Sequence, residues 1–86
     1  MLKRAEQDIR RRIDLSGGVS TLDQLCLDGI PILTFTITIR RLLEGCPKLE
    51  YLTMNDCEIR SLEGFPGLRR LIGLELADNQ YLLEYV

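Results

Sequence analysis

Residues 49–59 read LEYLTMNDCEI, and this stretch decides the fold. Its apolar residues follow the spacing L-x-x-L-x-L-x-x-N/C-x-L, with Cys57 at the ninth position. Because side chains alternate faces along a strand, Leu52 and Met54 should point the same way, into a core. Cys57 should then turn the chain behind the strand. The stretch therefore predicts a short buried strand followed by a turn.

The same spacing occurs twice more. Residues 71–81, LIGLELADNQY, fit it with Asn79 at the ninth position. Residues 22–32, LDQLCLDGIPI, fit its leucine positions, although Ile30 stands at the ninth. The three starts lie 27 and 22 residues apart. This pattern is similar to that of leucine-rich-repeat proteins, which implies an α/β solenoid with a right-handed parallel sheet and a convex side of helices or turns.

One repeat cannot bury its apolar side alone, so the repeats should stack as a single domain over residues 1–86. The predicted division of the chain is a capping helix at 1–16 and repeats at 22–48, 49–70 and 71–86. In the capping helix, Leu2, Ala5, Ile9 and Ile13 follow helical spacing. This helix should end before Ser16-Gly17-Gly18 and seal the first repeat from water.

The chain must return between strands on the convex side. Residues 36–44 predict a short helix that buries Ile39, Leu42 and Leu43, with Gly45 at a left-handed position after it. A strand is the alternative, because Thr alternates with Phe and Ile over residues 34–39. Residues 60–70 contain Gly64, Pro66 and Gly67, so this return should be a turn or a single 3₁₀-like turn rather than a helix.

Composition favours a small intracellular protein. Of the 86 residues, 45% are hydrophobic and 28% are charged, and the net charge is −2. The longest uncharged run, residues 29–39, is too short to span a membrane, and the first residues lack the apolar core of a secretion signal. Three cysteines without a CxxC pair fit reduced thiols. We therefore expect a nuclear or cytoplasmic location.

Three segments resemble the acidic leucine-rich nuclear phosphoproteins: L-x-x-L-x-L-D at 22–28, G-C-P-x-L-x-x-L at 45–52 and F-P-x-L-x-x-L-x-x-L-x-L-x-D-N at 65–79. The resemblance covers residues 9–80 and implies a regulatory scaffold that binds proteins through its concave sheet. The chain departs from that family because no long Asp/Glu tail follows its repeats. Roles that depend on such a tail are therefore not implied.

Catalytic chemistry finds no support in the sequence. The chain has no histidine, which removes His-based catalysis and most zinc ligand sets, and it has no phosphate-binding loop. Cys46 and Cys57 occupy repeat positions and should be structural, whereas Cys26 should face the concave side, where a reactive thiol is an alternative. We expect no enzyme activity, cofactor, metal or small-molecule substrate.

The outward side chains of the strands form the predicted partner-binding surface. Residues held on such a frame are already ordered, so binding costs them little entropy. Tyr51 is the predicted hot spot, and the alternative is that it only covers its neighbours. These side chains fall in three columns across the strands, and Ala77 completes the third column, which also contains Asp28 and Asn55. The predicted partner-binding residues are Gln24, Cys26, Asp28, Tyr51, Thr53, Asn55, Gly73 and Glu75.

Two further surfaces are predicted near the chain ends. Residues 1–13 carry a net charge of +3, so Arg10, Arg11 and Arg12 are the candidate RNA contacts of an alternative function, a structural subunit of a ribonucleoprotein. No aromatic residue interleaves with them for base stacking. A third interpretation is that the chain is a piece of a longer solenoid and has no independent role. The predicted site of self-association or docking comprises Tyr81, Leu82, Leu83, Tyr85 and Val86.

Overall fold

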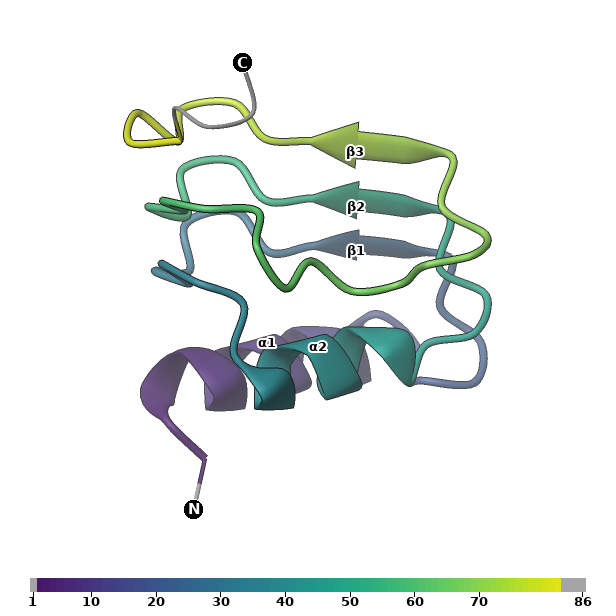
Figure 1. The fold of residues 1–86 in the computed structure, drawn as a ribbon. Coiled ribbons are helices and arrows are strands. Elements are labelled where there is room, and N and C mark those ends of the chain that lie inside the picture. The colour runs from purple at the N-terminus through teal and green to yellow at the C-terminus, as the bar shows by residue number, and fades with distance from the viewer. Residues whose placement is uncertain (1, 83–86) are drawn as a thin grey trace.

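The computed structural model describes residues 2–82. In this part of the chain two helices accompany one parallel sheet of three strands, in the order β1-β2-β3 (Figure 1). The elements in chain order are α1 (Arg4–Leu15), β1 (Gln24–Cys26), α2 (Ile37–Glu44), β2 (Tyr51–Thr53) and β3 (Gly73–Glu75). The predicted small α/β domain with a parallel sheet is confirmed, whereas its division into leucine-rich repeats stays a prediction.

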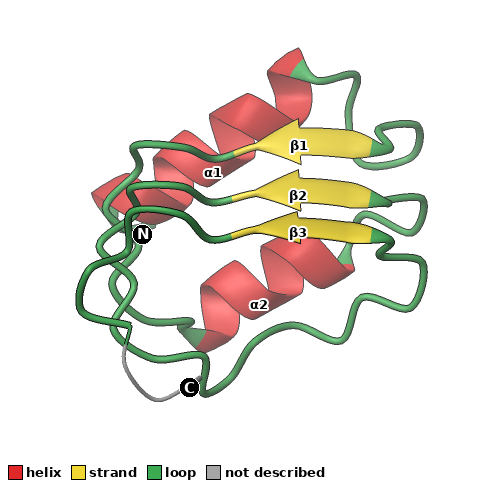
Figure 2. Ribbon diagram, turned by 90° about the horizontal axis from the view of Figure 1, so that it is seen from above, coloured by secondary structure: helices red, strands yellow, loops and turns green. Residues whose placement is uncertain are grey.

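The strands align as the three quoted stretches predict. Leu25 of β1 lies beside Leu52 of β2, which lies beside Leu74 of β3. Both helices and the return through residues 60–70 lie on one side of the sheet, so its other face is left open (Figures 1 and 2). The core lies between the sheet and these segments, and its most buried members are Ile9, Ile13, Leu27, Ile39, Leu43, Leu49, Leu52, Met54, Cys57 and Ile59.

Helix α1 is amphipathic and packs against β1 and α2. Ile9 and Ile13 are fully buried, as predicted, and Leu2 and Ala5 are half-buried. The helix ends at Leu15, and left-handed glycines at 17 and 18 turn the chain toward β1. This end of the helix is the one that the sequence predicts.

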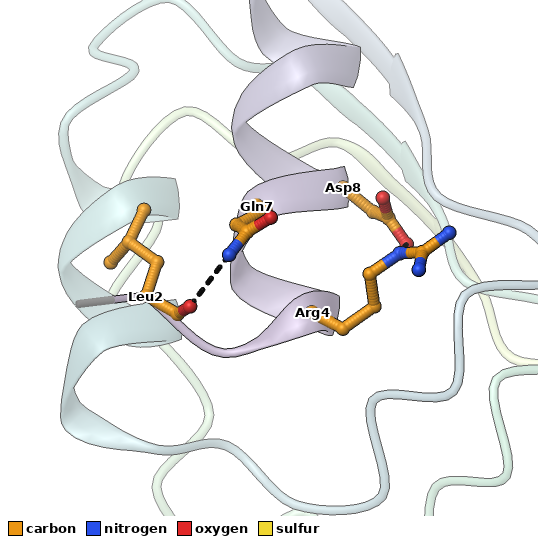
Figure 3. Close-up of polar contacts among 4 residues, drawn as sticks. All are labelled: Leu2, Arg4, Gln7 and Asp8. Atoms are coloured by element: carbon orange, nitrogen blue, oxygen red, sulfur yellow. Dashed lines mark hydrogen bonds and ion pairs between the residues drawn. The ribbon is translucent and has the colours of Figure 1, made fainter.

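Polar contacts close the first turns of α1. Figure 3 shows Gln7 donating from its side-chain amide to the carbonyl oxygen of Leu2 at 2.8 Å, and Arg4 beside Asp8 at 3.5 Å. The Lys3 N–H donates to Glu6 at 3.0 Å. The second carboxylate oxygen of Glu6 accepts from the Thr36 hydroxyl at 3.0 Å, which ties the start of α1 to the start of α2.

Helix α2 confirms the helical prediction over the strand alternative. Thr36 caps it by accepting from the Ile39 N–H at 3.2 Å, and Ile39 and Leu43 are buried. The prediction for Gly45 is wrong, because its φ of −74° is right-handed. A β-carbon at this position would stand 3.2 Å from the Arg41 carbonyl oxygen, which is a tight contact.

The second return contains no helix, as predicted. Its turn places the Phe65 N–H on the Leu62 carbonyl oxygen at 3.0 Å, and Phe65 packs edge-on against Phe35 with ring centroids 5.3 Å apart. Gly64 is left-handed, and a β-carbon on it would stand 3.0 Å from the Phe35 carbonyl oxygen. Neither helix in residues 2–82 has the length and apolar content needed to cross a membrane.

Candidate partner-binding face of the sheet

The outer face is the side of the sheet that points away from the helices, and two rows of predicted binding residues lie on it. The strand register aligns Gln24, Tyr51 and Gly73 in one row. Of the predicted residues in these two rows, Gln24, Cys26, Tyr51 and Glu75 are exposed, while Thr53 and Gly73 are half-buried. The second row consists of Cys26, Thr53 and Glu75.

Tyr51 and Gly73 form the centre of the first row. The Tyr51 side chain is 44% exposed, and its ring lies against the backbone of Gly73. A β-carbon at position 73 would stand 2.8 Å from Tyr51 Cδ1. The tyrosine therefore covers a neighbour and still presents an aromatic surface, and its role as a hot spot stays a prediction.

A shallow hollow of about 280 Å³ lies on the outer face beside Tyr51. The hollow lies beside β1 and β2 and extends to Ser16, the residue that follows α1. Its lining residues are Ser16, Gln24, Leu25, Cys26, Tyr51 and Thr53. The fold thus gathers four of the predicted binding residues around one depression.

Asp28, Asn55 and Ala77 form a third row, which is linked by hydrogen bonds. The Asp28 carboxylate accepts from the Asn55 N–H at 2.9 Å and from its side-chain amide at 3.3 Å. The Asn55 side-chain oxygen accepts from the Ala77 N–H at 2.7 Å, and its amide also donates to Glu75 at 3.0 Å. Each side chain thus reaches toward the next strand's segment, and Ala77 has no polar group to extend the series.

The hydrogen bonds to Asp28 favour the ionised form of its carboxyl group. Burial opposes ionisation, but donation from the Asn55 N–H and from the Asn55 side-chain amide outweighs this cost. The pKa of Asp28 is consequently lowered below its ordinary value. Asp28 and Asn55 therefore stabilise the sheet, and their additional role in partner binding stays a prediction.

Asn79 and Cys57 hold the turns behind β2 and β3. The buried Asn79 side-chain oxygen accepts from the N–H groups of Cys57 and Ile59, both at 3.0 Å. Its amide donates to the carbonyl oxygens of Met54 at 2.9 Å and Leu76 at 3.0 Å. The Cys57 thiol donates to the Leu27 carbonyl oxygen at 3.1 Å. The predicted structural use of these two positions is confirmed.

The three thiols lie in different environments. Cys26 is exposed, and Cys46 and Cys57 are buried. Burial raises the pKa of the Cys46 thiol, and it raises that of Cys57 to about 11. Within residues 2–82, no cluster of three or more His, Cys, Asp or Glu side chains is suited to hold a metal ion.

The arginines of α1 do not act as one patch. Arg10 and Arg11 are exposed, but Arg12 is half-buried and its guanidinium donates to the Cys26 carbonyl oxygen at 2.9 Å. This contact covers the free edge of β1. No pattern in the sequence predicts this contact, because it joins residues that are distant along the chain.

The predicted C-terminal docking surface is partly corrected. Tyr81 is 56% exposed, but Leu82 is only 8% exposed and belongs to the core. Leu82 therefore packs into the core, whereas the prediction placed it on an exposed docking surface. The remaining predicted residues, Leu83, Tyr85 and Val86, lie outside the described residues.

A hollow lined by carboxylates was not predicted. Its volume is about 290 Å³, and it lies beside the turns that follow β2 and β3. Asp56 and Glu58 come near Asp78 only because the strands stack, so one sequence does not show this proximity. The lining residues are Asp56, Glu58, Asp78, Gln80 and Tyr81.

Comparisons of the chain with protein-family models, curated proteins and solved structures found no match.

Proposed function

We propose that this chain is a non-catalytic protein-binding module that contacts its partner through the outer face of the sheet. The observation that carries the proposal is the hollow beside Tyr51, where four predicted binding residues meet on hydrogen-bonded strands. An aromatic side chain beside a shallow hollow suits a protein partner, because aromatic anchors supply much of the affinity at protein interfaces. Side chains on a hydrogen-bonded frame also lose little entropy on binding.

We further propose that the three strands belong to leucine-rich repeats at 22–48, 49–70 and 71–86, with 1–16 as a cap. The aligned inward leucines and the bonds of Asn79 and Cys57 support this division. So does the packing of α1 beside β1, where Arg12 covers the strand edge. The resemblance to the acidic leucine-rich nuclear phosphoproteins remains a prediction, as does a nuclear or cytoplasmic location.

The ribonucleoprotein alternative has weaker support. Arg12 is engaged with Cys26, so only Arg10 and Arg11 of the predicted RNA contacts are fully exposed. RNA binding driven by phosphate contacts gains affinity with each cation that it uses. Two exposed arginines supply few phosphate contacts and so little affinity. RNA binding is therefore one of the outcomes of the test below.

Photo-crosslinking can test the proposal. A benzophenone amino acid would replace Tyr51 on the outer face, Ile37 on α2 or Arg10 on α1, all three of which are exposed. The proposal predicts that position 51 crosslinks a discrete protein in extracts of the expressing cells and that position 37 does not. The captured protein must then bind the purified wild-type chain directly. Crosslinks only from position 37, or only to RNA from position 10, would refute the proposal.

A further inference from the structure

The outer face carries two carboxylates that one amide group holds near each other. The side-chain nitrogen of Asn55 donates to Asp28 at 3.3 Å and to Glu75 at 3.0 Å. Asp28 comes from the segment after β1 and Glu75 from β3, so the two negative charges meet because the strands stack. Like charges at this separation repel each other, and a cation beside both of them would relieve the repulsion.

The described chain supplies no such cation. Within residues 2–82, neither Asp28 nor Glu75 takes part in an ion pair. The three rows of the outer face contain no lysine or arginine. Arg12 reaches the edge of the sheet, but its guanidinium donates to the Cys26 carbonyl oxygen at 2.9 Å. The outer face therefore has a negative charge that residues 2–82 do not compensate.

An aromatic ring lies beside these charges. The Tyr51 ring rests against Gly73, which lies two positions before Glu75 on the same face of β3. The hollow beside Tyr51 also reaches Thr53, the partner of Glu75 in the strand register. An aromatic ring next to carboxylates suits a guanidinium, which stacks on rings and forms paired hydrogen bonds to a carboxylate. An ammonium gains less there, because it is a compact and strongly hydrated charge.

We propose that the outer face receives an arginine side chain of the protein partner, with its guanidinium on the Tyr51 ring and its hydrogen bonds to Glu75 and Asp28. This inference rests on the proposed function and names the chemistry of the partner, which is an exposed basic segment that contains arginine. Charge complementarity favours this occupant. An acidic segment would be repelled, and an apolar segment would bury two carboxylates without a cation.

A peptide titration tests the site without the natural partner. The probe is the capped heptapeptide GRGRGRG, followed in NMR spectra of the isotope-labelled full chain. It should shift the amide signals of Asn55 and Glu75 and the ring signals of Tyr51, with a dissociation constant below about 2 mM. The lysine counterpart should bind at least about threefold more weakly. Equal affinity of the two peptides, or shifts confined to other surfaces, would overturn the proposal.

Charge removal locates the site. Glu75→Gln keeps an oxygen that can accept from Asn55 but removes the charge, and it should weaken peptide binding about fivefold. The matched control is Asp56→Asn/Asp78→Asn, which removes two carboxylates from the neighbouring hollow. Asparagine suits both positions, because their φ values of 55° and 61° are left-handed. The control should bind like the wild type. A loss in the control as large as that in Glu75→Gln would refute the arginine site.

Two substitutions of Tyr51 test the stacking. Tyr51→Phe keeps the aromatic face and should bind the arginine peptide like the wild type. Tyr51→Leu should abolish the preference for arginine over lysine, because the ring is the group that distinguishes a planar cation. A preference that survives in Tyr51→Leu would contradict the stacked guanidinium.

These outcomes separate the inference from the proposed function. If position 51 crosslinks a protein but the arginine peptide does not bind the outer face, the inference alone fails. If the peptide binds as expected and position 51 captures no protein, the protein partner is refuted while the arginine site remains.

Discussion

The ring of Tyr51 occupies the space that a side chain at Gly73 would need. A β-carbon on Gly73 would lie 2.8 Å from Cδ1 and 3.3 Å from Cε1 of Tyr51, closer than packed carbon atoms approach. Because Gly73 of β3 has no side chain, the ring of Tyr51 on β2 can rest against its backbone. This relationship links a glycine inside a strand to the shape of the proposed binding face.

Gly73→Ala should move the Tyr51 ring. The ring is partly exposed and can rotate away, so the free energy of unfolding should change by less than about 1 kcal/mol. The ring resonances of Tyr51 in an NMR spectrum should shift, while those of Tyr81 should not. Unchanged Tyr51 resonances would mean that the ring does not rest on Gly73.

Asn79→Ala should destabilise the domain. The substitution leaves the N–H groups of Cys57 and Ile59 without their buried acceptor, which should lower the free energy of unfolding by about 1–3 kcal/mol. Urea denaturation measures this change, and Gln80→Ala at the exposed neighbouring position is the control. A loss equal to that of the control would show that the Asn79 bonds contribute nothing to the stability of the domain.

Ile9→Asp tests whether α1 seals the first strand. Ile9 is 0% exposed, so a charge there should lower the free energy of unfolding by about 2–4 kcal/mol. Leu15→Asp, on the same helix but 78% exposed, should cost less than about 1 kcal/mol. If both variants melt like the wild type, α1 is not part of the folded unit.

The carboxylate of Glu6 predicts an acid-sensitive contact between the helices. Its hydrogen bond from the Lys3 N–H, opposed by burial and aided by the Thr36 hydroxyl, lowers its pKa below the ordinary value of 4.5. A lowered folded-state pKa means that Glu6 stabilises the fold above pH 4.5 and that this contribution disappears as pH falls through the folded-state value.

Glu6→Gln should therefore be less stable than the wild type at pH 7, and the difference should shrink below pH 4.5. Thermal melts of both chains from pH 3 to pH 7 give this comparison. A stability difference that is constant over the whole range would show that the charge of Glu6 has no role.

The sequence is a good guide to local structure here. The spacing of apolar residues predicts the three strands, and the stripe that contains Ile9 and Ile13 predicts α1 together with its buried side. For α2 the sequence left two alternatives. The cap formed by Thr36 and the burial of Leu43 decide for a helix. Period and capping are short-range signals, so they are visible in one sequence.

Contacts between distant segments are not visible in that way. The bond from Arg12 to Cys26, the series that runs from Asp28 through Asn55, and the burial of Leu82 all depend on how the strands stack. Gly45 shows another limit. A glycine after a helix usually indicates a left-handed turn, but Gly45 keeps a right-handed backbone with a φ of −74°.

The central claim is that the outer face binds a protein, and the affinity of the crosslinked partner tests it most directly. Calorimetry would compare the wild-type chain with Tyr51→Ala/Glu75→Arg and with the control Ile37→Ala/Arg41→Glu on α2. The outer-face variant should lose at least about 3 kcal/mol of binding free energy, over a hundredfold in affinity, with its melting temperature within a few degrees of the wild type. The control should bind like the wild type. Undiminished affinity of the outer-face variant, with loss in the α2 variant, would contradict the account.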